Sequence, residues 1–515
     1  MPKRLLLCSV LIAMCAIETT WAADWPQLQK DAARTGRTSD VCAPPFRARW
    51  IWLGPSKTLR NKYSNAAWPD DLKGRSGYNY PMPTSVPMTL ANMVQPVAYR
   101  GMVYVGSMEG TAYGISANDG STIWQTSLPG GTIATGAAVG NVVVFNSVTG
   151  GVYAYNYLTG QQVWKVITPK AIVSAPCVIN DVVYSACQDG CVYAIQASTG
   201  QLLWRSQRMG GAIQGSLAAT ADAVYVGAED MNFYKLDART GTISAKHRVY
   251  GQSFRLLWPM IYNGKVWVST VTTQCVGSEY VNDAVFNSSA TFAAEEANME
   301  RWLNGDTNGG AWPNAAVGDW RHYYALDQKD LTEPFMILSG PSEGCGQPPD
   351  PPVVDNSNRV INWWPTRFAT LTKNSVPPIY VVFGTHYTID LAGVNQTNGH
   401  RVRIDNGKLS SPWPLETDNL YGLTVGGTYA YMRQNFRGTY AINLANSTHY
   451  QIQVQVRNRD GGNWNAPIMY VDTDSSPLPD TPSRNTQGRV GVSIADNRLY
   501  FTENYCITAV ETGPQ

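Results

Sequence analysis

The sequence predicts an all-β fold, a β-propeller of about eight four-stranded blades, on three observations. An aromatic motif recurs at a fixed spacing of 40 residues, each repeat has the pattern of short strands between tight turns, and the composition is that of a folded globular chain. Of the 515 residues 15% are charged and 11% are aromatic. These values exclude disordered and coiled-coil proteins, because both need more charge and fewer aromatic residues.

The repeated motif has three fixed columns. Its first column is a tyrosine, its second a turn glycine and its third a tryptophan, found at Tyr113, Tyr153 and Tyr193, at Gly120, Gly160 and Gly200, and at Trp124, Trp164 and Trp204. A fourth copy has Tyr234 and Gly241 but carries Ala245 in the tryptophan column. We interpret the repeated tryptophan as a large aromatic side chain that fills the same gap between neighbouring blades in each copy.

Each repeat contains four strands. The first has alternating apolar and polar residues at 102–107, 112–117 and 122–128, separated by Gly, Asn and Asp turns. A further strand begins seventeen residues before each tyrosine, at Pro96, Gly136, Pro176 and Leu217. Four-stranded units of about 40 residues are typical of propeller blades.

Later segments extend the series to eight units within a single domain, residues 24–515. Residues 321–331, 386–393, 437–447 and 505–513 each resemble the third strand and turn of a unit. Residues 46–53 precede the first unit, so we expect them to pair with the last unit and to close the ring without a free edge.

The fifth unit is interrupted by a partly helical insertion, residues 274–319. Phe292, Met299, Trp302 and Leu303 share one helical face there, and Asn304-Gly305 provides a stop signal. Insertions of this length are often lids or partner surfaces. A surface excursion without function remains an equal alternative.

The first 23 residues have the pattern of a signal peptide. Lys3 and Arg4 precede an apolar run at residues 5–17, which is too short to span a bilayer, and Ala22 or Ala23 suits cleavage. Removing Lys3, Arg4 and Glu18 from the 39 basic and 38 acidic residues leaves 37 of each. We therefore expect an exported, periplasmic or secreted, monomeric protein that neither spans a membrane nor binds nucleic acid.

The repeats resemble the pyrroloquinoline-quinone-like (PQQ-like) propeller family, whose units end in Tyr-Ala-Leu-Asp-x-x-Thr-Gly-x-x-x-Trp. The matching segments here are YGISANDGSTIW, YAYNYLTGQQVW, YAIQASTGQLLW and YKLDARTGTISA. Residues 24–27 (DWPQ) and 31–36 (DAARTG) look like the start of exported members. The resemblance implies one of two roles: a dehydrogenase of alcohols or sugars with PQQ and calcium in its channel, or a non-catalytic scaffold such as the lipoprotein of the outer-membrane barrel-assembly machinery.

The residues favour the non-catalytic branch. The quinone-binding enzymes of the family typically place an adjacent Cys-Cys disulfide against PQQ, and this sequence has no Cys-Cys pair and no Cys-x-x-Cys-His haem motif. It also has no His-Glu-x-x-His pair and no Gly-x-Ser-x-Gly elbow. We therefore predict no catalytic residue and no metal ligand, and PQQ and calcium remain only as implications of the resemblance.

Seven cysteines follow the leader, which allows three disulfides in an oxidising compartment. Cys187 and Cys191 flank the Gln188-Asp189-Gly190 turn and are expected to face each other. The other two candidate pairs are Cys275 with Cys345, across the insertion, and Cys42 with Cys506, which would join the N-terminal segment to the last blade.

One candidate ligand site stands at a channel mouth. Trp258-Pro259 and Trp364-Pro365 align with the starts of inner strands, with Arg255 and Trp363 nearby. An aromatic platform beside a cation suits a planar quinone or a sugar ring. The alternative, tryptophans packed between blades, is favoured.

We thus expect a binding or scaffold protein that acts through its propeller face and insertion on a protein, or on a small planar or sugar ligand. The alternatives are a PQQ-dependent dehydrogenase with an atypical site and a carbohydrate-binding propeller.

Overall fold

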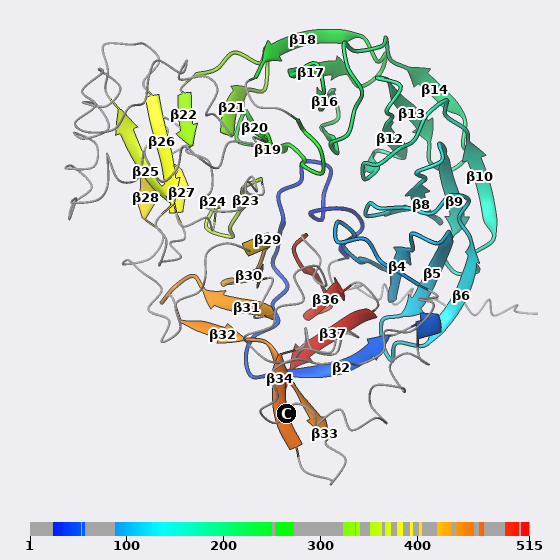
Figure 1. Ribbon diagram of the computed structural model, residues 1–515, viewed down its shortest axis with the longest axis vertical. Coiled ribbons are helices and arrows are strands. Elements are labelled where there is room, and N and C mark those ends of the chain that lie inside the picture. Colours follow the sequence, from blue (N-terminus) through cyan, green and yellow to red (C-terminus); the bar gives the residue numbers. More distant parts are fainter. Residues whose placement is uncertain are drawn as a thin grey trace, which may run out of the picture.

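The structure, a computed structural model, describes residues 24–52, 54–56, 88–249, 253–271, 323–334, 336–339, 351–362, 366–371, 379–384, 392–394, 401–403, 420–434, 438–446, 448–457, 463–467, 490–503 and 506–513. These residues form an all-β propeller, with sheets fanned about a common centre (Figure 1). The helical content of the described part is a single 3-10 turn, η1 (Gly54–Ser56).

The first four units follow one another along the chain, and each is a four-stranded antiparallel sheet that runs from an inner to an outer strand. Their strands are β3 (Val97–Tyr99), β4 (Met102–Gly106), β5 (Thr111–Ser116) and β6 (Thr122–Ser127); β7 (Ala137–Val139), β8 (Val142–Asn146), β9 (Val152–Asn156) and β10 (Gln162–Val166); β11 (Cys177–Ile179), β12 (Val182–Ala186), β13 (Val192–Gln196) and β14 (Leu202–Arg205); and β15 (Ala218–Ala219), β16 (Ala223–Ala228), β17 (Asn232–Asp237) and β18 (Ile243–Arg248). Every inner strand begins within one residue of its predicted start.

The remaining units are less regular. Unit 5 contains β19 (Met260–Tyr262), β20 (Lys265–Ser269) and β21 (Tyr323–Asp327); unit 6 contains β23 (Val353–Val354), β24 (Val360–Asn362), β27 (Ala392–Val394) and β28 (Arg401–Arg403). Unit 7 contains β29 (Leu420–Gly426), β30 (Tyr429–Gln434), β31 (Gly438–Asn443) and β32 (His449–Gln451), with β1 (Arg37–Thr38) added in parallel; unit 8 contains β35 (Ser493–Ala495), β36 (Arg498–Glu503), β37 (Cys506–Thr512) and β2 (Phe46–Trp52).

Two further groups of strands lie outside these units. The strands β22 (Met336–Ser339), β25 (Thr366–Leu371) and β26 (Ile379–Gly384) form a separate sheet, and β33 (Gln453–Arg457) pairs with β34 (Asn463–Pro467) in a hairpin that projects from the ring (Figure 1).

The structure corrects the predicted number of blades. The sequence predicted about eight four-stranded blades, whereas the described residues form seven blades of four or more strands. The difference falls at unit 5, where the chain leaves the sheet after β20 and the described residues supply three strands. The predicted insertion, residues 274–319, and its helical face lie outside the described residues.

The predicted ring closure is confirmed. The N-terminal strand β2 pairs antiparallel with β37, so that the two ends of the domain share one blade, and the inner strand β35 of that blade lies beside β3 of unit 1. A blade assembled from both chain ends ties the ring together, and β2 covers the edge of β37 that would otherwise be open.

The repeated tryptophans join consecutive blades, as predicted. Each indole Nε1 donates to a backbone oxygen in the next blade, with distances of 2.9 Å for Trp124 to Tyr157, 2.7 Å for Trp164 to Ala197 and 2.9 Å for Trp204 to Ala238. Each ring also packs on the repeated glycine of that blade, where an added Cβ would lie within 2.6 Å of ring or Cβ atoms. Trp50 of β2 makes the same joint to unit 1, with a 3.1 Å bond to the Ala117 oxygen.

Candidate functional site: the central channel

A segment of the chain itself occupies the centre of the propeller. Residues 24–41, here called the N-terminal strap, run across the middle of the ring (blue in Figure 1) and hydrogen-bond to the inner strands of the units or to the turns that follow them. The bonds follow the order of the units: Ala98 N to Trp25 O, Ala138 N to Pro26 O, Val178 N to Gln27 Oε1, Ala219 N to Ala32 O, Ile261 N to Ala33 O, Val354 N to Thr35 O, Val425 N to Gly36 O, and Val41 N to Asn497 Oδ1.

The strap buries polar side chains that satisfy the backbone of the inner strands. Arg34 is fully buried and donates to the oxygens of Leu28, Pro176 and Leu217 at 2.7, 3.0 and 3.0 Å. A buried guanidinium is tolerated only when its N–H groups are paired, and these three carbonyls supply the partners. Arg34 therefore ties the strap to units 3 and 4.

A second buried group, Gln95, joins the strap to the last blade. Its Oε1 accepts from Trp25 Nε1 at 3.0 Å and from the Gln29 amide at 2.8 Å, and its Nε2 donates to the Gly491 oxygen at 2.9 Å. Gln95 directly precedes Pro96, the predicted start of the first inner strand, but the sequence analysis assigned no role to Gln95 or to Arg34. The one available signal was the DWPQ and DAARTG pattern, which the family resemblance had marked.

The structure places the predicted aromatic platform differently. Trp258 is 2% exposed and packs in a core cluster with Leu28 of the strap, Ala134, Ala175 and Val490. Arg255, three residues earlier, is exposed. The two side chains therefore do not form an open platform, and Trp258 is a core residue, which was the favoured alternative.

Trp363 and Trp364 lie outside the described residues, between β24, which ends at Asn362, and β25, which begins at Thr366.

The described cysteines are thiols, not disulfides. Cys187 and Cys191 face each other across their turn, as predicted, with a 3.0 Å bond from the Cys187 amide to the Cys191 oxygen, but the Cys187 thiol lies against the Lys170 oxygen. Burial raises the pKa of the Cys187 thiol to about 11. Cys275 and Cys345 lie outside the described residues.

The predicted pair Cys42–Cys506 is wrong in register. The Cys42 thiol lies against the Val510 oxygen, whereas Cys506 is at the other end of β37, opposite Glu503. Four residues of extended strand span roughly 13 Å. A disulfide needs Cα atoms within about 7 Å. The N-terminal segment and the last blade meet as predicted, but the two cysteines lie at different positions along β37.

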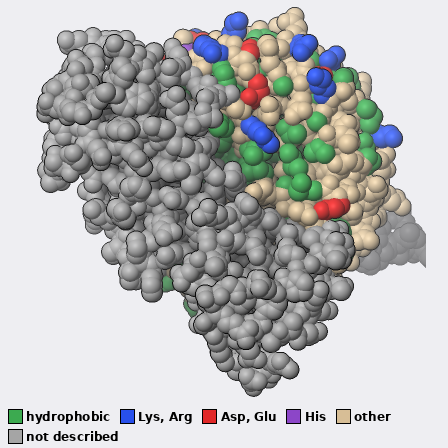
Figure 2. Space-filling model, in the orientation of Figure 1, with side chains coloured by type: hydrophobic (Ala, Val, Ile, Leu, Met, Phe, Trp, Pro, Cys, Tyr) green, Lys and Arg blue, Asp and Glu red, His purple; other side chains and the backbone are tan. Residues whose placement is uncertain are grey.

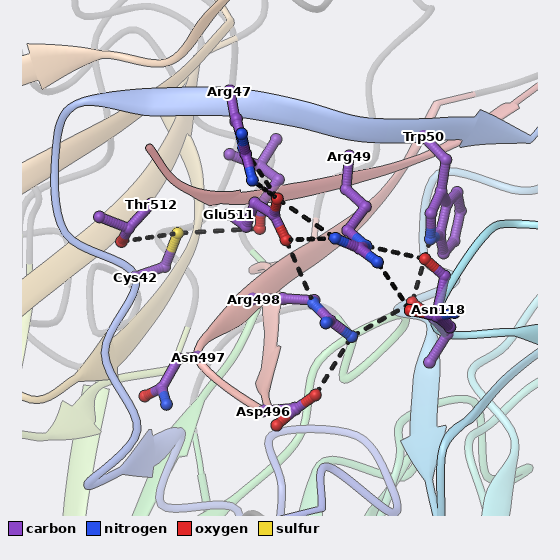
Figure 3. A network of polar contacts seen from close by, with 12 residues as sticks. Cys42, Arg47, Arg49, Trp50, Asn118, Asp496, Asn497, Arg498, Glu511 and Thr512 are labelled. Atoms are coloured by element: carbon purple, nitrogen blue, oxygen red, sulfur yellow. Dashed lines mark hydrogen bonds and ion pairs between the residues drawn. The ribbon is translucent and has the colours of Figure 1, made fainter. Parts of the chain in front are cut away.

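A polar network holds the closing blade in place of a disulfide (Figure 3). Glu511 of β37 accepts from Arg47 and Arg49 of β2, at 2.6 and 3.2 Å, and lies 3.6 Å from Arg498 of β36. Arg49 continues to the Asn118 oxygen of unit 1 at 2.7 Å. Burial opposes the charge on Glu511, but Arg47 and Arg49 outweigh it and hold the pKa of that carboxyl below its usual value.

The channel residues do not fit a bound PQQ. A quinone in the channel needs an open aromatic face and space along the axis, whereas Leu28, Gln29 and Arg34 are buried there and Trp258 packs in one cluster with Leu28. Within the described ranges, no group of three or more His, Cys, Asp or Glu side chains comes together that could hold calcium. On the described part of the face shown in Figure 2, Lys and Arg side chains are scattered among other residues.

Comparison with known proteins supports the resemblance. The family profile described as "Outer membrane protein assembly factor BamB" matches residues 64–205 and 149–277. Together with the observed ring of repeated sheets, this match supports the resemblance of the chain to the PQQ-like β-propellers. No curated protein sequence matches the chain.

Solved structures that are similar to this chain share little sequence identity with it. The quinohemoprotein alcohol dehydrogenase from Comamonas testosteroni is 12% identical with a TM-score of 0.51, covering 96% of this chain and 81% of that one. BamB from Moraxella catarrhalis is 14% identical with a TM-score of 0.46, covering 83% and 99%. A europium-containing methanol dehydrogenase is 12% identical with a TM-score of 0.49, covering 95% and 98%. In the described part of this chain, no helix has the length and apolar character to cross a membrane.

Proposed function

We propose that this protein is an exported, monomeric binding or scaffold propeller without quinone chemistry. The observation that carries the proposal is the N-terminal strap, which fills the channel with its own buried side chains and hydrogen-bonds to the units around it. A channel filled in this way leaves the faces of the propeller, its rim and the predicted insertion as the surfaces for partners. The basic and apolar leader supports export.

The fit of the strap also separates this proposal from its first alternative, a PQQ-dependent dehydrogenase of alcohols or sugars. Placing a quinone in the centre would displace Leu28 and expose Arg34 together with the three carbonyls that it binds. Leaving such groups unpaired in the interior costs several kcal/mol in total, at about 1–3 kcal/mol for each group.

The test is cofactor retention by the full chain. Purified protein is incubated with PQQ and calcium, desalted and measured for quinone absorbance and for dye reduction with alcohols and sugars. We expect neither in the wild-type protein. Retained PQQ with turnover would replace this proposal by the dehydrogenase.

A Leu28→Ala variant provides the matched control, because it opens space beside Trp258 without touching the hydrogen bonds of Arg34, which use the Leu28 backbone. Quinone that is retained by this variant but not by the wild-type protein would show that the strap is what excludes the cofactor.

A further inference from the structure

The turn between β3 and β4 of unit 1 contains a residue whose side chain is unfavourable for the backbone conformation of that position. The turns between the inner and second strands of units 1, 2, 3, 5 and 8 all have a left-handed residue at the same place. In four of them it is a residue that tolerates positive φ: Gly140, Asn180, Asn263 and Asp496. In unit 1 it is Arg100, with a φ of 50°. A long side chain held in this region stores backbone strain, and such strain concentrates at functional sites.

The Arg100 side chain stacks on aromatic rings without a polar partner among the described residues. Its guanidinium carbon lies 5.0 Å from the ring centroid of Tyr99 and 5.5 Å from that of Tyr157. Among the described residues it donates no side-chain hydrogen bond and makes no ion pair. Two other stacked arginines differ: Arg37 donates to the Asp355 oxygen at 2.9 Å, and Arg205 pairs with Asp189 at 3.0 Å.

A hydrogen-bond acceptor, the Asp24 carboxylate, and a group that can donate or accept, the Tyr157 hydroxyl, lie near this guanidinium at the start of the strap. Asp24 accepts from the Arg100 amide at 2.9 Å through Oδ1, and within the described part of the chain its Oδ2 has no partner. The Tyr157 hydroxyl is likewise unbonded among the described residues, and Leu158, the next residue in the chain, is 53% exposed. Asp24, Arg100 and Tyr157 are all half-buried, so a ligand can reach them.

The balance of charge disfavours an anionic ligand. The carboxylates of Asp24, Asp31 and Asp40 together offset the charges of Arg100 and of nearby Lys30. An anionic ligand therefore gains little net attraction here. A pair of sugar hydroxyls matches the groups well, because a guanidinium donates two parallel bonds, a carboxylate oxygen accepts, and a tyrosine hydroxyl does either.

We propose that Arg100, Asp24 and Tyr157, with Leu158 beside them, form a binding site for a neutral carbohydrate between units 1 and 2, where the strap begins. Arg100 is held by the two tyrosine rings and presents its free N–H groups to adjacent hydroxyls. Asp24 Oδ2 accepts from a hydroxyl, and Leu158 offers apolar surface to the C–H groups of the sugar ring. The site rests on the proposed binding function and names its ligand class.

The experiment uses the full chain and defined probes. Neutral hexasaccharides of glucose (α- and β-linked) and of N-acetylglucosamine are titrated by calorimetry, with hexagalacturonate and hexaglutamate as the anionic arms. Concentrations up to roughly 10 mM detect a Kd of about 1 mM. We expect at least one neutral probe to bind more tightly than both anionic probes.

Arg100→Asn is the decisive variant, because Asn suits the turn and removes the guanidinium. We expect it to weaken binding about tenfold or more, which is the loss of about 1.4 kcal/mol. Its denaturation midpoint should equal or exceed that of the wild-type protein. Tyr157→Phe should weaken binding to a smaller extent, and Asn180→Gly, in the equivalent turn of unit 3, should leave it unchanged.

Three outcomes would overturn the site: no binding of any neutral probe, binding that survives Arg100→Asn, or tighter binding of hexagalacturonate or hexaglutamate. A lower midpoint for Arg100→Asn would instead assign the residue a structural role. The cofactor test reads absorbance and turnover, so a failed carbohydrate site leaves the non-quinone proposal standing, and retained PQQ does not decide the carbohydrate site.

Discussion

The joints that connect the closing blade and units 1 to 5 are of two kinds. The closing blade and units 1 to 3 each pack a tryptophan on a glycine of the next unit, as Trp164 does on Gly200. In the joint from unit 4 to unit 5, the small residue takes the place of the tryptophan and a large residue takes the place of the glycine. Ala245 stands in the tryptophan column, and Leu331, 1% exposed, stands at the place of the turn glycine.

This exchange shows that the ring conserves the volume of a joint and not the identity of its residues. Leu331 occupies the left-handed position of the turn, with a φ of 61° and the same amide bond, here to Asp327, that Gly241 makes to Asp237. A bond from the Tyr225 hydroxyl to the Gln328 oxygen, at 2.8 Å, remains where the indole bond is lost. The hydrophobic contact is therefore kept with different atoms on each side.

Trp164→Ala tests the tryptophan joint most directly, and we expect the largest loss. The indole is 7% exposed and donates a buried hydrogen bond, so its removal should lower the free energy of unfolding by about 3–5 kcal/mol. Urea denaturation followed by far-UV circular dichroism measures the change. Ala245→Gly, at the same column in unit 4, should cost about 1 kcal/mol or less. Equal losses at both sites would contradict the distinction between the joints.

Gly200→Ala tests the empty side of the joint. The new Cβ would lie 2.5 Å from an atom of Trp164 and would have to adopt a φ of 75°. We expect a loss of about 2–3 kcal/mol, of which about 1 kcal/mol comes from the left-handed backbone and the rest from the contact.

Gly264→Ala is the matched control, because that glycine has a φ of 73° with nothing within 4 Å of the added Cβ. The same urea titration should give only the backbone part, about 1 kcal/mol. If the two variants lose the same stability, the indole does not need the glycine.

Ala245→Trp tests the exchange of sizes. With Leu331 in place the new indole overpacks the joint, and we expect a loss of about 2 kcal/mol. Combining it with Leu331→Gly should restore the tryptophan joint, so that the double variant is more stable than the sum of the single changes by about 1 kcal/mol or more. A double-mutant cycle measures this coupling, and additive losses would show that the two positions are independent.

The features that could be predicted from the sequence are those with a repeated side-chain pattern, and the features that were missed depend on backbone contacts or on strand register. The tryptophan column was predictable because three consecutive copies present the same side chain to the same glycine, so that spacing alone reveals it. The strap was not, since most of its bonds join backbone groups far apart in the chain, such as Ala32 and Ala219, and these impose no side-chain pattern. The Cys42–Cys506 pairing failed for a related reason: strand partners were readable, but the register along β37 was not.

The closing joint has a feature that the internal tryptophan joints lack, and acid should reveal it. Trp50 packs on Gly120 as the other tryptophans do, but Glu511 and its arginines connect the two chain ends beside it. Because the pKa of Glu511 is lowered in the folded state, its contribution is complete above the unfolded value of 4.5 and is lost as the pH falls below it through the folded pKa.

Glu511→Gln should therefore cost about 1 kcal/mol at pH 7 and almost nothing once the wild-type carboxyl is protonated. Urea midpoints of both proteins, measured from pH 7 down to about 3, give the difference, and other carboxylates with lowered pKa values cancel in it. A difference that stays constant over this range would show that Glu511 acts at the closing joint through its shape and not through its charge.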